Sequence, residues 1–360
     1  MRILLALAAT LAASALAAQP AAQPASCEAA LDSLQTVFRR DYPGYRTKVA
    51  GREAELAALT DSVRAVVRTS EDHRVCVAQG LQRWVRFFRD PHVMLWQAGP
   101  PPPPSSAAAP ASADAPAPED PGRPTLRFRD DSTAILRIPD LDAAYKGAVD
   151  SLVAASRARL LRTPYLLVDV RGNGGGCTCT YESIVPLFYT GPIAITGNDV
   201  WSSEGNLAAM REWSTDPVMP EGIRRTAAAV VARMEANPGR FVPWVADTTL
   251  RMDTVYPQPR AVGVLVDAEC ASSCENLVLD AMQSRKVTVA GAGNTKGVGD
   301  YGNVRSLWLP GWRRLRIPTS RSRRLPRRPI DGIGIPPQLR IPAGEADPVE
   351  FTLRHLRARR

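Results

Sequence analysis

The segment from residue 99 to residue 122 constrains the fold most, because it consists mainly of proline, alanine and serine and opens with the run Pro100 to Pro104. Proline has a fixed φ and no N–H group, and the small residues offer little apolar surface to bury. Such a segment cannot form part of a packed core. We therefore predict a linker at residues 98–123, with a separate folded part on each side of it.

The part before the linker reads as helices. Residues 27–42, 50–69 and 75–89 carry apolar side chains every three to four positions, the period of an amphipathic helix. The sequence therefore predicts a small helical domain at residues 27–97.

The part after the linker alternates strand patterns with helix patterns. Residues 165–170 and 262–267 are continuous apolar runs, which are typical of strands buried on both faces of a parallel sheet. Strand, crossover helix and strand predict an α/β fold. We expect this domain at residues 124–347, with a polar, tryptophan-containing insertion at 199–244 and an arginine-rich tail at 348–360.

The first residues have the three sections of a secretory signal peptide. Arg2 is followed by an apolar run at residues 3–13 and then by Ala15-Leu16-Ala17. The run is too short to span a bilayer. We predict a signal peptide at residues 1–18, a periplasmic or secreted location, and no membrane insertion after signal cleavage.

Six cysteines in an exported chain indicate disulfide bonds. Cys27 and Cys76 both lie in the helical part, and we expect them to pair. The other four cysteines belong to the later part, where we expect further bridges, but the sequence does not say which cysteines pair. A bridge between the two later pairs would join two distant segments. The later spacings, C-x-C and C-x-x-x-C, differ from the C-x-x-C of common zinc sites, so we expect no metal. These four cysteines are Cys177, Cys179, Cys270 and Cys274.

The formal net charge of +9 comes mainly from arginines spread along the chain, with one cluster at residues 321–328. No nucleic-acid-binding motif accompanies that cluster, so we predict no nucleic-acid partner. We interpret the cluster as a solvated loop.

A glycine-rich loop directly follows the first buried strand, with Gly174, Gly175 and Gly176 in a row. Successive glycines allow backbone N–H groups to point at an anion, as in an oxyanion hole. A dinucleotide motif would need glycine at Cys177, so we expect no cofactor. Glycines that only make a turn are the alternative interpretation.

Ser272 lies between the second buried strand and the helix pattern that follows. A hydroxyl at a helix start is close to backbone N–H groups and to the positive end of the helix dipole, which suits a nucleophile. Ser272 and Glu275 also fit the capping box S-x-x-E, a purely structural role. The local sequence leaves both interpretations open.

A serine nucleophile needs a base, and the chain has three histidines, His73, His92 and His355. His73 and His355 lie in polar surroundings, whereas His92 stands where the helical part turns toward a strand-like stretch. Lys296 is the other candidate, and burial would have to keep it neutral.

Four blocks in order resemble the tail-specific (C-terminal processing) serine protease family, peptidase family S41. The resemblance covers about residues 125–342 and implies a ClpP/crotonase-like spiral of ββα units acting on a polypeptide substrate. It also implies that Ser272 attacks the substrate carbonyl, while N–H groups of Ser273 and of Gly174 or Gly175 bind the oxyanion. The blocks are Leu166 to Gly176, Ala271 to Glu275, Val289 to Gly291 and Gly332 to Pro337.

Two catalytic schemes occur in that family. One branch uses a Ser–Lys dyad and usually carries a PDZ domain, but here the linker stands in its place and residues 291–296 match the lysine block poorly. The PDZ-less branch, similar to tricorn core and retinoid-binding-protein-like members, implies His92 as base and Asp331 as the acid that orients it. We predict the histidine scheme. Lys296 as base, or a non-hydrolytic binding protein on the same fold, are the alternatives; the oligomeric state stays open.

Overall fold

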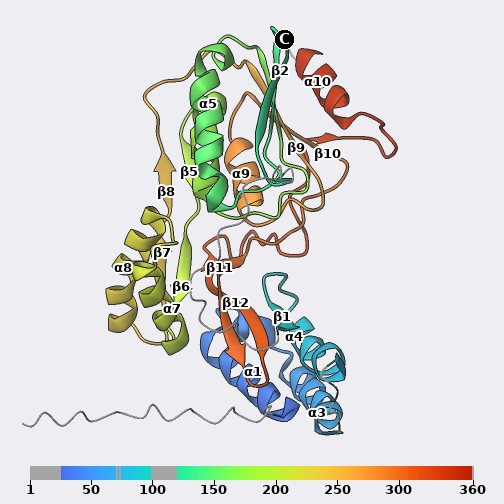
Figure 1. Ribbon diagram of the computed structural model, residues 1–360, viewed down its shortest axis with the longest axis vertical. Helices are drawn as coiled ribbons and strands as arrows, with labels where there is room; N and C mark the ends of the chain where they lie inside the picture. Colours follow the sequence, from blue (N-terminus) through green and yellow to red (C-terminus); the bar gives the residue numbers. More distant parts are fainter. Residues whose placement is uncertain (1–25, 70–71, 73, 99–119, 359–360) are drawn as a thin grey trace, which may run out of the picture.

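The computed structural model describes residues 26–69, 72, 74–98 and 120–358, so the predicted signal peptide and most of the predicted linker lie outside it. Two lobes follow one another along the long axis (Figure 1). One lobe holds a six-stranded sheet with its helices, and the other holds the N-terminal helices with a second sheet. The predicted α/β class, with a helical region before it, is confirmed.

The N-terminal lobe is built from amphipathic helices around an aromatic core. Phe38 and Trp84 meet edge to face with ring centroids 5.0 Å apart, and Phe88 packs on both. The predicted Cys27–Cys76 disulfide is confirmed and joins the first helix to the fourth helical segment, with Cα atoms 5.9 Å apart. The helical elements are α1 (Cys27–Asp41), α2 (Tyr45–Val49), α3 (Glu53–Thr69), the π-helical η1 (Val75–Leu81) and α4 (Gln82–Arg86).

This lobe does not stand alone, because its last strand enters a sheet formed by later parts of the chain. Strand β1 (Met94–Gln97) pairs antiparallel with β12 (Arg313–Ser322), and β11 (Tyr301–Leu309) takes the other edge of β12. Strand β6 (Asn198–Trp201) pairs with the far end of β12 and continues to β7 (Phe241–Val245). The sequence analysis did not predict β11 and β12, whose side chains complete the core of the helical lobe.

The six-stranded sheet has the order β13-β10-β9-β4-β3-β2. All its neighbours are parallel except β2, which forms a hairpin with β3. Strands β4, β9 and β10 are buried along their whole length, as their continuous apolar sequences predict. The strands are β2 (Thr125–Asp130), β3 (Thr133–Arg137), β4 (Tyr165–Asp169), β9 (Ala261–Val266), β10 (Val287–Gly291) and β13 (Leu339–Arg340).

Helices cover both faces of this sheet (Figure 1). Helices α5 (Lys146–Leu160) and α9 (Ser273–Ala281) share one core with Leu166 and Val168 of β4. Helix α10 (Pro348–Ala358) packs Leu353 and Leu356 against the opposite face, where Tyr165 and Leu167 point. The segment predicted as an arginine-rich tail is thus a helix that closes the second face. The remaining short elements are η2 (Ala143–Tyr145), η3 (Thr178–Ile184), α6 (Val185–Phe188), β5 (Ile193–Ile195) and β8 (Thr248–Leu250).

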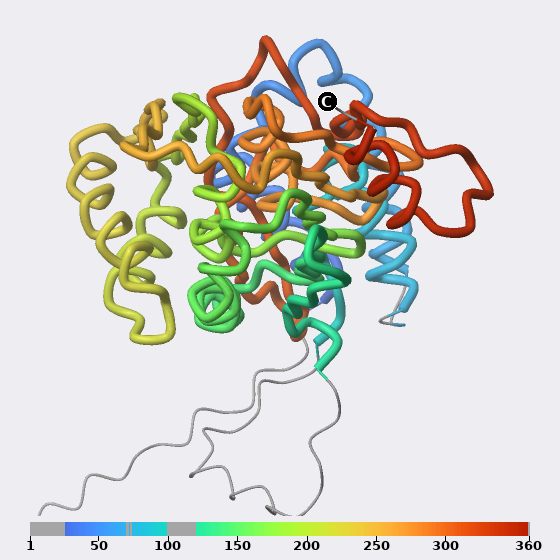
Figure 2. The backbone as a smooth tube through the Cα atoms, turned by 90° about the horizontal axis from the view of Figure 1, so that it is seen from above, coloured from blue at the N-terminus to red at the C-terminus, as the bar shows by residue number. Residues whose placement is uncertain are grey.

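The segment predicted as an insertion forms an arm of two helices, α7 (Glu204–Thr215) and α8 (Glu221–Ala236), between β6 and β7. It has its own small core around Met210, Val230 and Trp244. In the view from above, the arm stands on the opposite side of the molecule from the C-terminal segment (Figure 2). The arm therefore lies beside the region where the two lobes meet (Figure 1).

The prediction of a solvated loop at residues 321–328 is wrong for the first half of that segment. Arg321 belongs to β12, and its guanidinium lies 3.6 Å from the centre of the Phe241 ring. Arg324 is 9% exposed and donates from Nη2 to the Gly299 carbonyl at 2.6 Å. Arg327 and Arg328 are exposed, as the prediction had them. Arg321 and Arg324 pack against the protein because the aliphatic part of an arginine side chain is apolar, while its guanidinium group contacts a ring or a hydrogen-bond acceptor.

Replacing Cys27 and Cys76 together by alanine should lower the free energy of unfolding by about 3–4 kcal/mol, since this bridge closes a loop with a sequence separation of 49. Urea unfolding under non-reducing conditions measures the loss. The matched control is the Cys177→Ala/Cys179→Ala pair, whose loop spans a separation of 2 and restrains the unfolded chain far less. Equal losses in the two double variants would contradict the loop-closure argument.

Candidate active site

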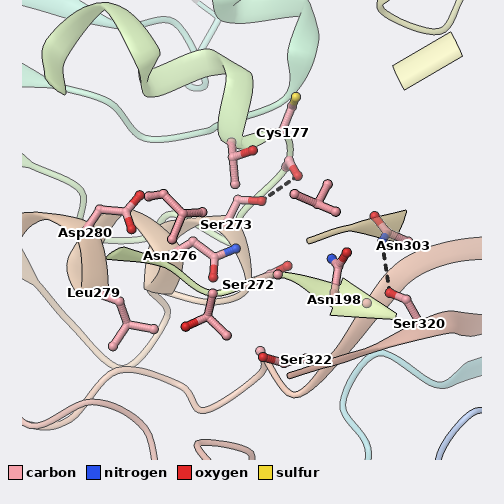
Figure 3. A pocket seen from close by; sticks show the side chains of 18 of the residues that line it. Cys177, Asn198, Ser272, Ser273, Asn276, Leu279, Asp280, Asn303, Ser320 and Ser322 are labelled. Atoms are coloured by element: carbon pink, nitrogen blue, oxygen red, sulfur yellow. Dashed lines mark hydrogen bonds between the residues drawn. The ribbon is translucent and has the colours of Figure 1, made fainter. Parts of the chain in front are cut away.

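The candidate site lies at the carboxyl ends of the parallel strands, where loops after neighbouring strands meet. The loop after β4 and the loop after β9 are bonded to each other. Ala271 donates its N–H to the Asn173 carbonyl at 3.1 Å, and Ser273 Oγ donates to the Gly176 carbonyl at 2.7 Å. The glycine loop and the serine turn that the sequence singled out are therefore adjacent (Figure 3).

Ser272 occupies the N-cap position of α9 with φ 56° and ψ −116°. Positive φ is unusual for a residue with a side chain and indicates a strained turn held by its surroundings. The capping box with Glu275 is present, and Ser272 Oγ also lies 3.2 Å from Nε2 of His92. The two interpretations left open by the sequence are thus compatible, because the cap fixes the turn that presents the hydroxyl.

Glu275 is the buried partner that holds this turn. Its carboxylate has no solvent exposure and accepts from Ser272 N at 3.1 Å, and from Gly297 N and Val298 N at 2.8 Å each. Thr295 Oγ1 donates to the same carboxylate at 2.6 Å. Four donors converge on two oxygens, so a buried charge is compensated entirely by hydrogen bonds.

The Gly332 to Ile335 block supports the loop that carries these donors. Ile335 N donates to Thr295 Oγ1 at 2.7 Å, and Thr295 N donates to the Ile335 carbonyl at 3.1 Å. Gly334 has φ +71°, and a Cβ there would collide with the Thr295 carbonyl. Only glycine fits that position, so the block acts on Ser272 indirectly, through Thr295 and Glu275.

His92 lies in the turn between α4 and β1. Its backbone N–H donates to Asp90 Oδ1 at 2.9 Å, and the other oxygen of Asp90 accepts from Tyr42 at 2.7 Å. Two residues further on, Met94 pairs with Arg316 of β12. The backbone that carries His92 is therefore held from one side by the helical lobe and from the other by the shared sheet.

Burial lowers the pKa of His92, and the Arg316 guanidinium lowers it further, while the Asp90 carboxylate acts in the opposite direction. The ring is consequently neutral near pH 7, and Nε2 can accept a proton. The Nδ1 atom is buried and has no hydrogen-bond partner among the described residues. The Tyr301 backbone is close enough to raise the pKa slightly, but no well-formed hydrogen bond joins it to the ring.

The structure does not bring Asp331 into hydrogen-bond contact with His92. Asp331 Oδ1 accepts instead from Gly299 N and Asp300 N, each at 2.8 Å, and Asp300 Oδ2 accepts in return from Asp331 N at 2.9 Å. Oδ2 of Asp331 is buried without a partner in the described part of the chain. Burial raises the pKa of Asp331 to about 7, and the nearby Asp90 and Asp300 carboxylates add to the rise.

Lys296 lies in the same cleft but its ammonium group points elsewhere. It pairs with Glu269 at 2.6 Å, and its side chain is 44% exposed. A lysine base has to be buried, whereas Lys296 is exposed and paired with a carboxylate. The geometry therefore favours His92 over Lys296 as the partner of Ser272.

The backbone amides predicted to bind an oxyanion differ in whether their N–H groups already donate a hydrogen bond. Gly175 N donates to Asn173 Oδ1 at 2.9 Å and is occupied. The N–H groups of Gly174 and Ser273 have no hydrogen-bond partner among the described residues, and both residues line the cleft beside Ser272. Gly175 instead permits the close approach, because a Cβ there would meet Ser272 Cβ at 2.8 Å.

Ser272 opens into a cleft of about 1760 Å³ between the lobes, larger than the pockets of about 300–1,000 Å³ that enclose small ligands. One wall is α9, and the opposite wall is the β11–β12 sheet with Asn303 and Ser320 (Figure 3). The arm contributes a third wall through Trp213, Met219 and Ile223. The described residues contain no group of three or more His, Cys, Asp or Glu side chains placed to hold a metal ion.

The later cysteines form two local bridges, Cys177–Cys179 and Cys270–Cys274, with Cα separations of 5.1 and 5.4 Å. The suggested bridge between the glycine loop and the serine turn is therefore absent from the described residues. Those two loops are joined by backbone hydrogen bonds instead. The Cys270–Cys274 bridge encloses Ser272 itself and is completely buried.

A family model supports a serine-type peptidase. The model for peptidase family S41 matches residues 132–341, which is more than half of the chain. The chain belongs to peptidase family S41, as the sequence blocks predicted. A comparison with curated protein sequences finds no match.

Solved structures share the fold across both lobes at low identity. A peptidase from Parabacteroides merdae matches with a TM-score of 0.60 and 15% identity over 92% of this chain and 97% of its own. Mature CPAF complexed with lactacystin matches with a TM-score of 0.58 and 12% identity, over 92% and 97%. A lipoprotein from Streptococcus agalactiae matches with a TM-score of 0.51 and 12% identity, over 94% and 98%. At these identities the similarity shows the fold.

Glu275→Gln should lower the free energy of unfolding by about 3 kcal/mol or more, because one carboxylate oxygen becomes an NH₂ group facing N–H donors. The variant should also lose reactivity at Ser272, whose backbone Glu275 holds. Urea unfolding and a serine-directed fluorophosphonate probe give the two readouts. Glu269→Gln is the matched control, since its partner Lys296 is exposed and such pairs contribute about 1 kcal/mol or less. Equal stability of the two variants would contradict the role of Glu275.

Asp331→Asn should flatten the pH dependence of stability between about pH 4 and pH 7. Because the native pKa is about 7 against 3.8 for the free group, the native state holds a proton that the unfolded chain releases, so wild-type stability falls as pH rises through this window. Relative to wild type, the variant should gain roughly 2–4 kcal/mol between pH 4 and pH 8. Urea unfolding at several pH values measures this, with the fully exposed Asp131→Asn as control. Parallel curves for wild type and Asp331→Asn would refute it.

Proposed function

We propose that this chain is an endopeptidase in which Ser272 attacks the scissile carbonyl and His92 is the general base. The observation that carries the proposal is the 3.2 Å approach of Ser272 Oγ to His92 Nε2, between residues 180 positions apart in the sequence. A second support is the lowered pKa of His92, which keeps its ring ready to accept a proton.

The reaction then follows acyl-transfer chemistry. His92 Nε2 takes the proton from Ser272 Oγ as the oxygen bonds to the substrate carbonyl carbon, and the negative charge moves to the carbonyl oxygen. We assign the stabilisation of that oxyanion to the unpaired N–H groups of Ser273 and Gly174. His92 returns the proton to the leaving amine as the peptide bond breaks, and water then releases the acyl group from Ser272 by the same steps.

We assign the stabilisation of the His92 imidazolium to Asp90, and not to Asp331 as predicted from the sequence. Asp90 is the carboxylate whose charge acts on the pKa of His92, and it also holds the backbone of that residue. Asp331 receives a supporting role in this proposal, because it ties residues 299 and 300 to the Gly332 block.

The substrate we propose is an extended polypeptide segment in an exported protein. The cleft beside Ser272 has a volume of about 1760 Å³, which exceeds that of small-ligand pockets and suits a polypeptide segment. An extracytoplasmic location is supported by the predicted signal peptide and by three disulfide bonds. No helix among the described residues has the length and apolar character to cross a membrane.

A fluorophosphonate probe should label Ser272 in wild type and fail with Ser272→Ala. His92→Ala should reduce the labelling rate by about 100-fold or more, as expected for loss of a general base, whereas Lys296→Ala should leave it within about threefold. The wild-type rate should rise with pH through a midpoint below 6.5, because burial lowers the pKa of His92. A Lys296→Ala variant that loses labelling, or a folded wild type that neither labels nor cleaves any peptide, would reject the proposal.

A further inference from the structure

One face of α9 runs along the cleft from Ser272. Asn276 and Asp280 follow Ser272 at successive spacings of four, so they share one side of the helix, and Gln283 lies just beyond its end. All of them line the cleft, and Asp280 and Asn276 project from the helix on the side of Ser273 (Figure 3). The helix that begins at the nucleophile therefore also presents an acidic side chain to the substrate.

Asp280 is a carboxylate without a cation. Its Oδ2 accepts from the Tyr181 hydroxyl at 2.9 Å, and no lysine or arginine of the described residues pairs with it. Burial raises the pKa of Asp280 to about 6, while the Tyr181 hydrogen bond opposes the rise. Glu182 and Arg251 also line the cleft, but Glu182 is 67% exposed and lies 3.6 Å from Lys146, and Arg251 makes no ion pair with any described residue.

The position of Asp280 suits a long side chain. Eight residues at 1.5 Å per residue place it about 12 Å along the helix from Ser272. Val185, Leu279 and Met282 also line the cleft and provide apolar surface. A lysine or arginine has this form, because an apolar stem packs along such a surface while the charged head reaches an acceptor.

We propose that Asp280 lies at the bottom of a specificity subsite. This subsite binds a lysine or arginine side chain of the polypeptide substrate next to the scissile bond. This inference rests on the proposed peptidase function. A carboxylate at the base of a pocket beside a serine nucleophile selects basic side chains in trypsin by the same physical principle.

A role limited to holding Tyr181 does not explain the charge. A tyrosine hydroxyl needs only a neutral acceptor, whereas a carboxylate in this partly buried place costs solvation that no cation of the described chain offsets. A bound guanidinium or ammonium group supplies that cation and hydrogen-bond donors together. The carboxylate of Asp280, which has no cation partner among the described residues, therefore indicates that the ligand carries a basic group.

The first test is digestion of an unbiased peptide library with the wild-type enzyme, with cleavage positions determined by mass spectrometry. The expected result is enrichment of lysine and arginine at one fixed position adjacent to the cleaved bond. Cleavage without such enrichment overturns this inference and leaves the peptidase proposal in place. A folded enzyme that cleaves no peptide overturns both.

The second test compares matched peptides that carry arginine or leucine at that position. Asp280→Asn keeps an acceptor for Tyr181 but removes the charge, and it should reduce the ratio of kcat/KM for the arginine peptide to that for the leucine peptide by at least about tenfold. Glu182→Gln removes an exposed charge from the same wall and should not change this ratio. A ratio unaffected by Asp280→Asn, as a purely structural role would give, overturns the inference.

Discussion

The buried carboxylate of Glu275 is the interaction on which the active site depends. An ionised group without solvent exposure is tolerated only when hydrogen bonds replace its hydration, and here donors from the serine turn and from the loop at residues 295–298 do so. The Gly332 to Ile335 block then holds Thr295 in place. Two segments of the chain thus meet at Glu275 and a third supports them through Thr295, so the turn that carries Ser272 is held in place.

The second requirement is that two lobes cooperate. The nucleophile belongs to the six-stranded sheet and the base to the helical lobe, and strand β1 connects them by pairing with β12. The loop-closure entropy of that long-range contact is offset by a core that Leu309, Leu315 and Ile317 share with the N-terminal helices. Burial between the lobes then favours the uncharged form of both titrating groups, because it lowers the pKa of His92 and raises the pKa of Asp331. It keeps His92 neutral and favours a protonated Asp331 up to about pH 7.

Predictions from apolar periodicity were accurate within the described residues, whereas predictions from residue type alone, such as the arginine-rich loop and tail, were corrected. Apolar periodicity located the N-terminal helices and the buried strands β4 and β9, because burial acts on each segment by itself. Strands β11 and β12 were missed, although arginine and apolar side chains alternate at residues 314–317 of β12. The sequence left the connectivity of the later disulfides open, and the structure shows that both bridges are local.

The sequence by itself determined the α/β class, the helical region before it and the S41 family, because ordered blocks and residue periods are properties of the linear chain. It also pointed to Ser272 and His92 as a pair. Only the tertiary structure decided that His92 Nε2 reaches Ser272 Oγ, that Lys296 and Asp331 are engaged with other partners, and that Asp280 faces the cleft unpaired. The physical reason is that hydrogen bonding and burial depend on which side chains meet in space, and several hundred residues of chain must fold before they do.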